Sequence, residues 1–219
     1  MTTHFGSGSV SHYPHFDFDA LYRGESPAAG VPAMTPPPWD TKAPKESVVG
    51  WQNAGLVRGA VLDIGCGLGD NAIYLARQGH SVTGLDISPT ALHTASRRAA
   101  DAGVNVTFAV ADATSLASYT DAFDTVVDSG MFHCLDDDGK RRYAAALHRA
   151  TRRSARLLLS CFSDANADDE SWPRPVVSEQ TLRDVFGGAG WDITSIEAAT
   201  VQRPDGPKMA FFLVEAQRR

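Results

Sequence analysis

Short apolar runs alternate with stretches of helical spacing along most of the chain, starting near residue 45. The apolar runs predict strands at 60–64, 81–86, 106–110, 123–128, 156–162, 191–198 and 209–216. The helical spacing predicts helices near 45–55, 70–78, 89–101, 138–151 and 179–187. Strands and helices that alternate in this way favour an α/β fold, a mostly parallel sheet with helices on both faces. The turn-rich segment 203–207 separates the last two strands, which we therefore expect to form a hairpin.

Capping signals mark the ends of two predicted helices. Ser88 is followed by Pro89, the order of a side-chain cap and a proline at the first helical position. Gly103 supplies the stop for the same helix. Ser178 provides a second cap, so we expect the helix at 179–187 to begin directly after it.

The first 44 residues do not follow this alternation. Five prolines lie between 32 and 44, and a proline-rich segment does not build the interior of a sheet. We therefore expect 1–44 to form a lid over a domain made of 45–219. Asp17 would cap a short helix in the lid or contact a ligand. Several aromatic side chains would enclose a flat apolar ligand, namely Tyr13, Phe16, Tyr22 and Trp39.

Composition narrows the class of protein. The chain has 219 residues, a formal net charge of −6 and a hydrophobic content of 43%, which is ordinary for one globular domain. Basic residues occur only in short clusters, which argues against nucleic acid as a partner. No apolar run approaches the roughly 20 residues that span a bilayer, so we expect neither a membrane segment nor a secretory signal. The three cysteines lack metal-ligand spacing, and we expect a reduced, cytoplasmic protein without a metal site.

The most informative stretch follows the first predicted strand and reads Val61-Leu62-Asp63-Ile64-Gly65-Cys66-Gly67-Leu68-Gly69-Asp70. Its three glycines bring the backbone close to a ligand at a strand-to-helix turn. Acids end the next two strands, Asp86 lying 21 positions after Gly65 and Asp112 after the third strand. An acid after the second strand accepts hydrogen bonds from both ribose hydroxyls, so this order predicts an adenosine-bearing cofactor.

The glycine turn also fits a dinucleotide fingerprint, because Gly67 to Ala72 has the pattern G-x-G-x-x-A. Two acids count against that alternative. Asp63 stands where a dehydrogenase usually continues its apolar strand, and Asp70 would face a pyrophosphate at the start of the next helix. An amino-acid tail with an ammonium group tolerates such acids, whereas a diphosphate does not.

The order of these residues resembles motifs I to III of the class I S-adenosylmethionine-dependent methyltransferases. The resemblance implies S-adenosyl-L-methionine as the cofactor and a Rossmann-like, seven-stranded sheet whose last strand inserts antiparallel. It places Asp86 at the ribose, Asp112 at the adenine and Asp63 behind the turn, bonded to the turn's backbone. A helix cap at Asp86 and a surface turn at Asp112 remain as alternatives. The expected cofactor residues are Asp63, Gly65, Gly67, Gly69, Asn71, Asp86, Ile87, Asp112, Ala113, Asp128 and Ser129.

The fourth predicted strand runs into the loop Asp128-Ser129-Gly130-Met131-Phe132-His133. In a doubly wound sheet the ligand crevice lies at the carboxyl ends of the strands, so this loop would flank the reacting atoms. With Trp39-Asp40 and the segment 172–178, the loop resembles small-molecule methyltransferases of the thiopurine and tellurite-resistance type, most closely a subgroup acting on heterocyclic toxins such as hydroxyquinolones. The substrate residues implied are Tyr13, Phe16, Tyr22, Trp39, Met131, Phe132, Trp172 and Arg174, with core packing as the alternative for Met131 and Phe132 and a surface ion pair for Arg174.

His133 is the candidate catalytic residue, because a neutral histidine can take the proton that a hydroxyl, thiol or ring N–H loses. Its alternative is a structural histidine bonded within the loop, and an acceptor that is already ionised would need only orientation. We predict methylation of O or N of a small aromatic heterocycle by a monomer or homodimer. S-Methylation of thiols, thiopurines or sulfide is the alternative activity, and a cofactor-binding sensor or partner subunit is the alternative without catalysis.

Overall fold

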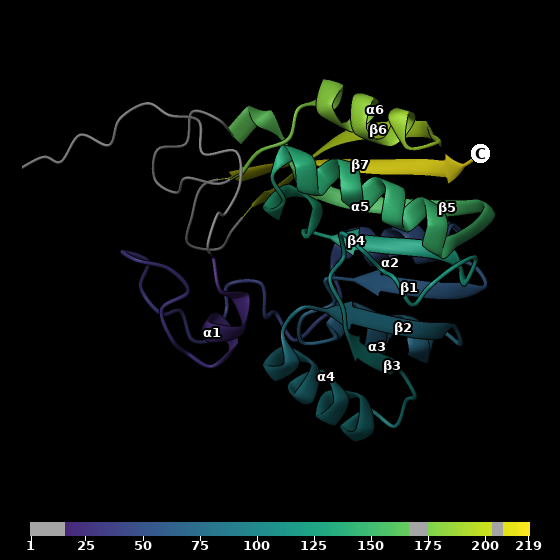
Figure 1. The fold of residues 1–219 in the computed structure, drawn as a ribbon. Coiled ribbons are helices and arrows are strands. Elements are labelled where there is room, and N and C mark those ends of the chain that lie inside the picture. Colours follow the sequence, from purple (N-terminus) through teal and green to yellow (C-terminus); the bar gives the residue numbers. More distant parts are fainter. Residues whose placement is uncertain (1–15, 167–174, 203–207) are drawn as a thin grey trace, which may run out of the picture.

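The computed structural model describes residues 16–166, 175–202 and 208–219, which form helices around one sheet (Figure 1). The strands are β1 (Ala60–Ile64), β2 (Ser81–Asp86), β3 (Thr107–Val110), β4 (Phe123–Ser129), β5 (Thr151–Phe162), β6 (Trp191–Gln202) and β7 (Lys208–Arg218). The α-helices are α1 (Phe18–Tyr22), α2 (Glu46–Asn53), α3 (Asp70–Arg77), α4 (Pro89–Asp101), α5 (Asp137–Ala150) and α6 (Glu179–Gly188). Two short 3₁₀ helices, η1 (Phe132–Cys134) and η2 (Asp164–Asn166), follow β4 and β5.

The sheet has the strand order β3-β2-β1-β4-β5-β7-β6. Neighbours from β3 to β5 pair in parallel, and β7 pairs antiparallel with both β5 and β6. This confirms the predicted Rossmann-like sheet, its inserted antiparallel last strand and the terminal hairpin. The strand order switches direction between β1 and β4, and such switch points are where open α/β sheets bind ligands, at the carboxyl ends of the strands.

Successive strand residues point into two separate cores, as the pleat of a sheet requires. Leu62 and Ile64 of β1 belong to a core that includes residues of α5 and α6. Val61, on the opposite face of the same strand, belongs to a second core with residues of α2 and α3. Figure 1 shows these two pairs of helices on opposite sides of the sheet, which confirms the predicted two-sided arrangement.

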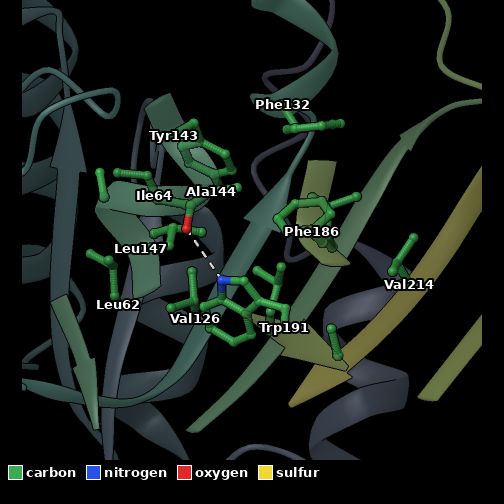
Figure 2. Packing of buried hydrophobic residues seen from close by; sticks show 14 of the residues in the cluster. Leu62, Ile64, Val126, Phe132, Tyr143, Ala144, Leu147, Phe186, Trp191 and Val214 are labelled. Carbon is green, nitrogen blue, oxygen red and sulfur yellow. Dashed lines mark hydrogen bonds between the residues drawn. The ribbon is translucent and has the colours of Figure 1, made fainter. Parts of the chain in front are cut away.

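Trp191, the first residue of β6, anchors α5 to the sheet. It is 1% exposed, and its indole N–H donates to the carbonyl oxygen of Ala144 in α5 at 3.2 Å (Figure 2). A buried tryptophan brings a large apolar surface and needs a partner for its one polar group, and this contact supplies both. This contact therefore fixes the middle of α5 against the sheet.

The predicted caps are confirmed. Ser88 accepts a hydrogen bond from the N–H of Ala91 at the start of α4, and Ser178 accepts one from Thr181 at the start of α6. Asp17 caps α1 by accepting from the N–H of Ala20 at 2.9 Å. Within the described residues, no helix is long and apolar enough to cross a membrane.

The start of β5 differs from the prediction, because the strand begins at Thr151 rather than at 156. Thr151 pairs with Phe123, but the register shifts before Arg156 pairs with Thr125. Ser154, within this irregular stretch, has a φ of 60°. The residues of the stretch are largely exposed, so they lack the apolar signal from which the rest of the strand was predicted.

Candidate active site

The glycine turn joins β1 to α3 at the carboxyl edge of the sheet. The N–H groups of Gly65 and Cys66 both donate to the carbonyl oxygen of Leu85 in β2, at 2.7 and 3.0 Å. Gly67 has a φ of 51°, and a Cβ there would stand 2.7 Å from the hydroxyl of Tyr22. Both the left-handed backbone and this close approach require glycine. At Gly67 the turn therefore presents backbone, rather than a side chain, to the N-terminal segment that packs on it.

Asp63 lies behind this turn and is 1% exposed. Burial raises its pKa to about 7, against a bond from the N–H of Ala72, and the charges of Asp128 and Asp86 raise it further. Among the described residues, its Oδ2 is a buried polar atom without a hydrogen-bond partner. The predicted backbone bond is thus to α3 rather than to the glycines, and one carboxylate oxygen is left for a cation.

Asp86 ends β2 and is 9% exposed. Its carboxylate accepts hydrogen bonds from the N–H of Gly67 at 2.8 Å and from the N–H of Ser88 at 2.9 Å. Burial raises its pKa, while these backbone bonds act in the opposite direction. Asp86 thus ties the glycine turn to the start of α4, a role close to the cap that the sequence left open.

Two large apolar side chains are exposed beside Asp86. Ile87 is 61% exposed and Val110, which ends β3, is 59% exposed. Val110 pairs in register with Asp86, so the two apolar side chains belong to neighbouring strand ends. Asp112 follows on the same edge, where it accepts from the N–H and the hydroxyl of Thr114, both at 2.8 Å. Exposed apolar side chains at this edge suit the faces of a flat ring, and the sequence analysis missed Val110.

Asn71 takes a different position. Its Oδ1 accepts from the backbone N–H of Lys45 at 2.9 Å, directly before α2. The side chain predicted for the cofactor therefore holds the end of the N-terminal segment to the start of α3.

Asp128 shapes the loop after β4. Its carboxylate is fully buried and accepts hydrogen bonds from the N–H of Met131 at 2.8 Å and from the Tyr143 hydroxyl at 2.7 Å. Burial raises the pKa of Asp128 to about 6.

The residues around Asp128 differ in burial. Phe132 is fully buried, with its ring centroid 5.1 Å from that of Phe186. The core-packing alternative thus describes Phe132. Met131 is half-buried, with its Cβ 2.7 Å from where a Cβ on Gly65 would be. Ser129, which follows Asp128, is half-buried. Ala113 packs against the core that includes residues of α5 and α6.

His133 lies in η1, at the end of this loop, and is 6% exposed. Its Nδ1 accepts from the backbone N–H of Phe162 at 3.4 Å, and the two rings are 4.5 Å apart. Burial, with a smaller contribution from the charge of Lys140, lowers its pKa to about 3. The ring is therefore neutral near pH 7, and with Nδ1 accepting, Nε2 carries the proton. In this arrangement His133 is a hydrogen-bond donor.

Two aromatic side chains of the N-terminal segment meet over the glycine turn. The indole N–H of Trp39 donates to the Tyr22 hydroxyl at 2.8 Å, and that hydroxyl faces Gly67. Phe16 contacts Phe18, with ring centroids 4.7 Å apart. The remaining predicted substrate residues, Tyr13, Trp172 and Arg174, lie outside the described residues.

Ion pairs fix this segment to the helices beside the site. Arg98 of α4 binds Asp40 through two nitrogen atoms, each at 2.9 Å, and Asp70 at 3.0 Å. Asp19 of α1 accepts from the hydroxyl of Ser88 at 2.6 Å and from the N–H of Thr90 at 3.0 Å. The sequence analysis missed the Arg98 contacts, whose partners lie 58 and 28 positions away and share no motif with it.

Comparison with known proteins identifies the family. A family model described as a methyltransferase domain matches residues 61–154. A 2-heptyl-1-hydroxyquinolin-4(1H)-one methyltransferase of Mycobacteroides abscessus is 36% identical over 184 residues, which cover 83% of this chain and 79% of the relative. This chain belongs to the class I S-adenosylmethionine-dependent methyltransferases. The methyltransferase is thus an enzyme that uses S-adenosylmethionine, and the dinucleotide and non-catalytic alternatives are set aside.

Solved structures agree with this assignment. One, described as the conversion of a disulfide bond into a thioacetal group during echinomycin biosynthesis, has a TM-score of 0.81 and 38% identity, covering 92% of this chain and 90% of that chain. TehB from Haemophilus influenzae has a TM-score of 0.67 at 20% identity, covering 83% of this chain and 64% of that chain. At that identity TehB supports the fold alone.

The site of the methyltransferase fits its cofactor chemically. The unpartnered carboxylate oxygen of Asp63 suits the ammonium group of the amino-acid end. The exposed side chains of Ile87 and Val110 suit a flat base. Within the described ranges, no group of three or more His, Cys, Asp or Glu side chains is arranged to hold a metal ion.

Proposed function

We propose that this methyltransferase transfers a methyl group to an oxygen or nitrogen of a small aromatic heterocycle of the hydroxyquinolone kind. The observation that carries the proposal is the relative from Mycobacteroides abscessus, which is named for that activity and matches 83% of this chain. The matched length extends well beyond the cofactor motifs, so the similarity includes parts of the chain that would contact the acceptor.

The proposed mechanism depends mainly on the alignment of the acceptor with the methyl group. S-Adenosylmethionine, when bound, supplies a methyl group on a positively charged sulfur. The chain must hold the acceptor in line with that methyl group and keep water away. His133 would orient the acceptor through the proton on Nε2, while Met131 and the pair of Tyr22 and Trp39 would enclose it. The N-terminal segment 1–44 would act as the lid that closes this space.

Methyl transfer from labelled S-adenosylmethionine to a panel of hydroxyquinolones, phenols, thiopurines, thiols and sulfide tests the proposal. Mass identification of each product shows which atom receives the methyl group. Turnover of a hydroxyquinolone at O or N is the expected result. Turnover of thiols or sulfide alone would refute the proposed acceptor class.

Sulfur acceptors form the second candidate, and one observation favours them. The solved structure at 38% identity belongs to a study of disulfide conversion, which is chemistry at sulfur. The same panel decides between the two candidates, because product masses and reduction-resistant S-methyl groups separate O, N and S products.

A further inference from the structure

Lys140 carries a buried ammonium group that has no role in the mechanism proposed above. It lies in the first turn of α5, and its side chain is 3% exposed. Among the described residues its one hydrogen-bond acceptor is Oδ1 of Asp137, at 3.4 Å, and the Asp137 side chain is 72% exposed. A lysine that packs only its stem would keep its charged end in water. An ion pair with a well-solvated partner offsets little of the cost of burying the charge.

The helix makes this position more costly for a cation. The amino end of an α-helix carries a partial positive charge, which favours acids in the first turn and disfavours a lysine. Asp138, the next acid along, pairs with Arg141 and Arg142 at 3.7 and 3.5 Å. Asp128 is bonded to Tyr143 and the loop backbone. In the described part of the chain, Lys140 has no second carboxylate as an ion-pair partner.

Lys140 and His133 belong to the same edge of the sheet. α5 begins shortly after β4 and η1 end, at the carboxyl edge of the sheet (Figure 1). Lys140 lies in the first turn of this helix, and Cα–Cβ bonds on a helix tilt toward its amino end. Its charge acts on His133, in η1, and on Cys161, near the end of β5, and lowers the pKa of each. An ammonium group and a ring N–H are both donors, so a ligand that reaches both side chains at this edge would meet two hydrogen-bond donors.

We infer that Lys140 and His133 together bind the methyl acceptor as an anion, so that the enzyme selects aromatic compounds with an ionised ring hydroxyl or N-hydroxyl oxygen. The inference deepens the proposed function and rests on it. A lone pair of the anionic oxygen forms the new bond to the methyl carbon, the carbon–sulfur bond breaks, and its electron pair neutralises the sulfonium. The acceptor has already lost its proton to water, so no base on the chain takes part.

Binding of 1-hydroxyquinolin-4(1H)-one in the presence of S-adenosylhomocysteine tests the inference without turnover. Ionisation changes the absorbance of this probe, so a pH titration gives the pKa of the bound molecule directly. In the native protein we expect the bound pKa to lie at least one unit below the free value, since the anion would bind at least tenfold more tightly than the neutral form. Lys140→Met should abolish this preference, and Lys140→Arg should retain it.

Arg141→Met is the matched control, because it removes one charge from the same helix at a side chain that is 64% exposed. It should leave the bound pKa unchanged. An unshifted pKa in the native protein, or an equal shift in native protein and Lys140→Met, would overturn the inference. Where Lys140→Met does not fold, Asp137→Asn decides: anion affinity should rise two- to threefold, and unchanged or weaker affinity contradicts the inference.

The outcomes separate the inference from the proposed function. Selective binding of the anion, with methyl transfer only to thiols, would refute the proposed function and leave the anion site in place. Methylation of a hydroxyquinolone, with no effect of Lys140→Met on the bound pKa, would refute the anion site alone.

Discussion

Replacement of Asp63 by asparagine should stabilise the protein without cofactor and weaken cofactor binding at the same time. The carboxyl group has a pKa of about 7 in the folded protein, against an ordinary value of 3.8. Between these values the folded state binds more protons than the unfolded state, so the stability contributed by this group falls as pH rises through that window. At about 1.4 kcal/mol for each pH unit, the ionised group costs about 4 kcal/mol above pH 7.

Asparagine is neutral at every pH and has nearly the same shape, so it escapes this cost. The stability difference between Asp63→Asn and the native protein should therefore grow by about 2–3 kcal/mol between pH 5 and pH 8. Urea denaturation at both pH values measures it. An equal stability difference at pH 5 and pH 8 would show that ionisation of the buried carboxyl group does not have the free-energy cost assigned to it.

Cofactor binding should change in the opposite direction. The ammonium group of S-adenosylmethionine would hold Asp63 in its ionised form, so binding near pH 6 should release about one proton. Calorimetry in buffers of different ionisation enthalpy counts that proton. Loss of the charged contact in Asp63→Asn should weaken binding by about 2–3 kcal/mol, or roughly 30- to 160-fold. Native-like affinity in the variant, or no proton release in the native protein, would refute the role of Asp63.

Four further changes test other parts of the site. Asp86→Ala should weaken cofactor binding by about 2–3 kcal/mol in calorimetry, because the variant would lose the predicted ribose contacts as well as the bond to the glycine turn; unchanged affinity would contradict its assignment. Arg98→Ala should destabilise the protein by about 1–2 kcal/mol in thermal unfolding, since the half-buried Asp40 and Asp70 lose their partner, and an unchanged melting temperature would contradict a stabilising role of these ion pairs. His133→Ala should lower kcat/KM at least tenfold without moving any inflection between pH 6 and 8, because the ring does not titrate there, and the loss of such an inflection would restore the role of base. Removal of residues 1–44 should leave a folded core with poorer selectivity among acceptors, whereas native kinetics on the whole panel would end the lid hypothesis.

The sheet could be predicted from the sequence because the signals for most of its strands are local. β1, β2 and β4 are apolar runs, and the caps at Ser88 and Ser178 sit directly before their helices. The start of β5 was missed because its exposed residues have no apolar pattern, and it is recognised only through the pairing of Thr151 with Phe123 of β4. Register across strands is a tertiary property, and no local pattern records it.

The same distinction between local signals and tertiary contacts applies to the residues of the site. The glycine turn and Asp86 carry a spacing that sequence analysis can recognise, and the structure brings them into direct contact. Val110 and Arg98 carry none, since one was predicted simply as the end of a strand and the other as part of a helix. Asp128 was predicted at the end of the fourth strand and lies in β4, but its bond to Tyr143 depends on how α5 packs against β4.

The two ends of the site show the same physical feature with opposite charge. At the end of β1, Asp63 is a buried carboxyl group with an unpartnered oxygen, and at the start of α5, Lys140 is a buried ammonium group with one weak, solvated partner. Each is unfavourable in the protein alone, because a buried charge requires a nearby counter-charge. The cofactor carries an ammonium group and the proposed acceptor an anionic oxygen, so binding of both would supply the two missing partners. Stabilisation by the cofactor should therefore depend on Asp63, and additional stabilisation by the acceptor on Lys140, and thermal unfolding with each ligand alone and with both separates the two contributions.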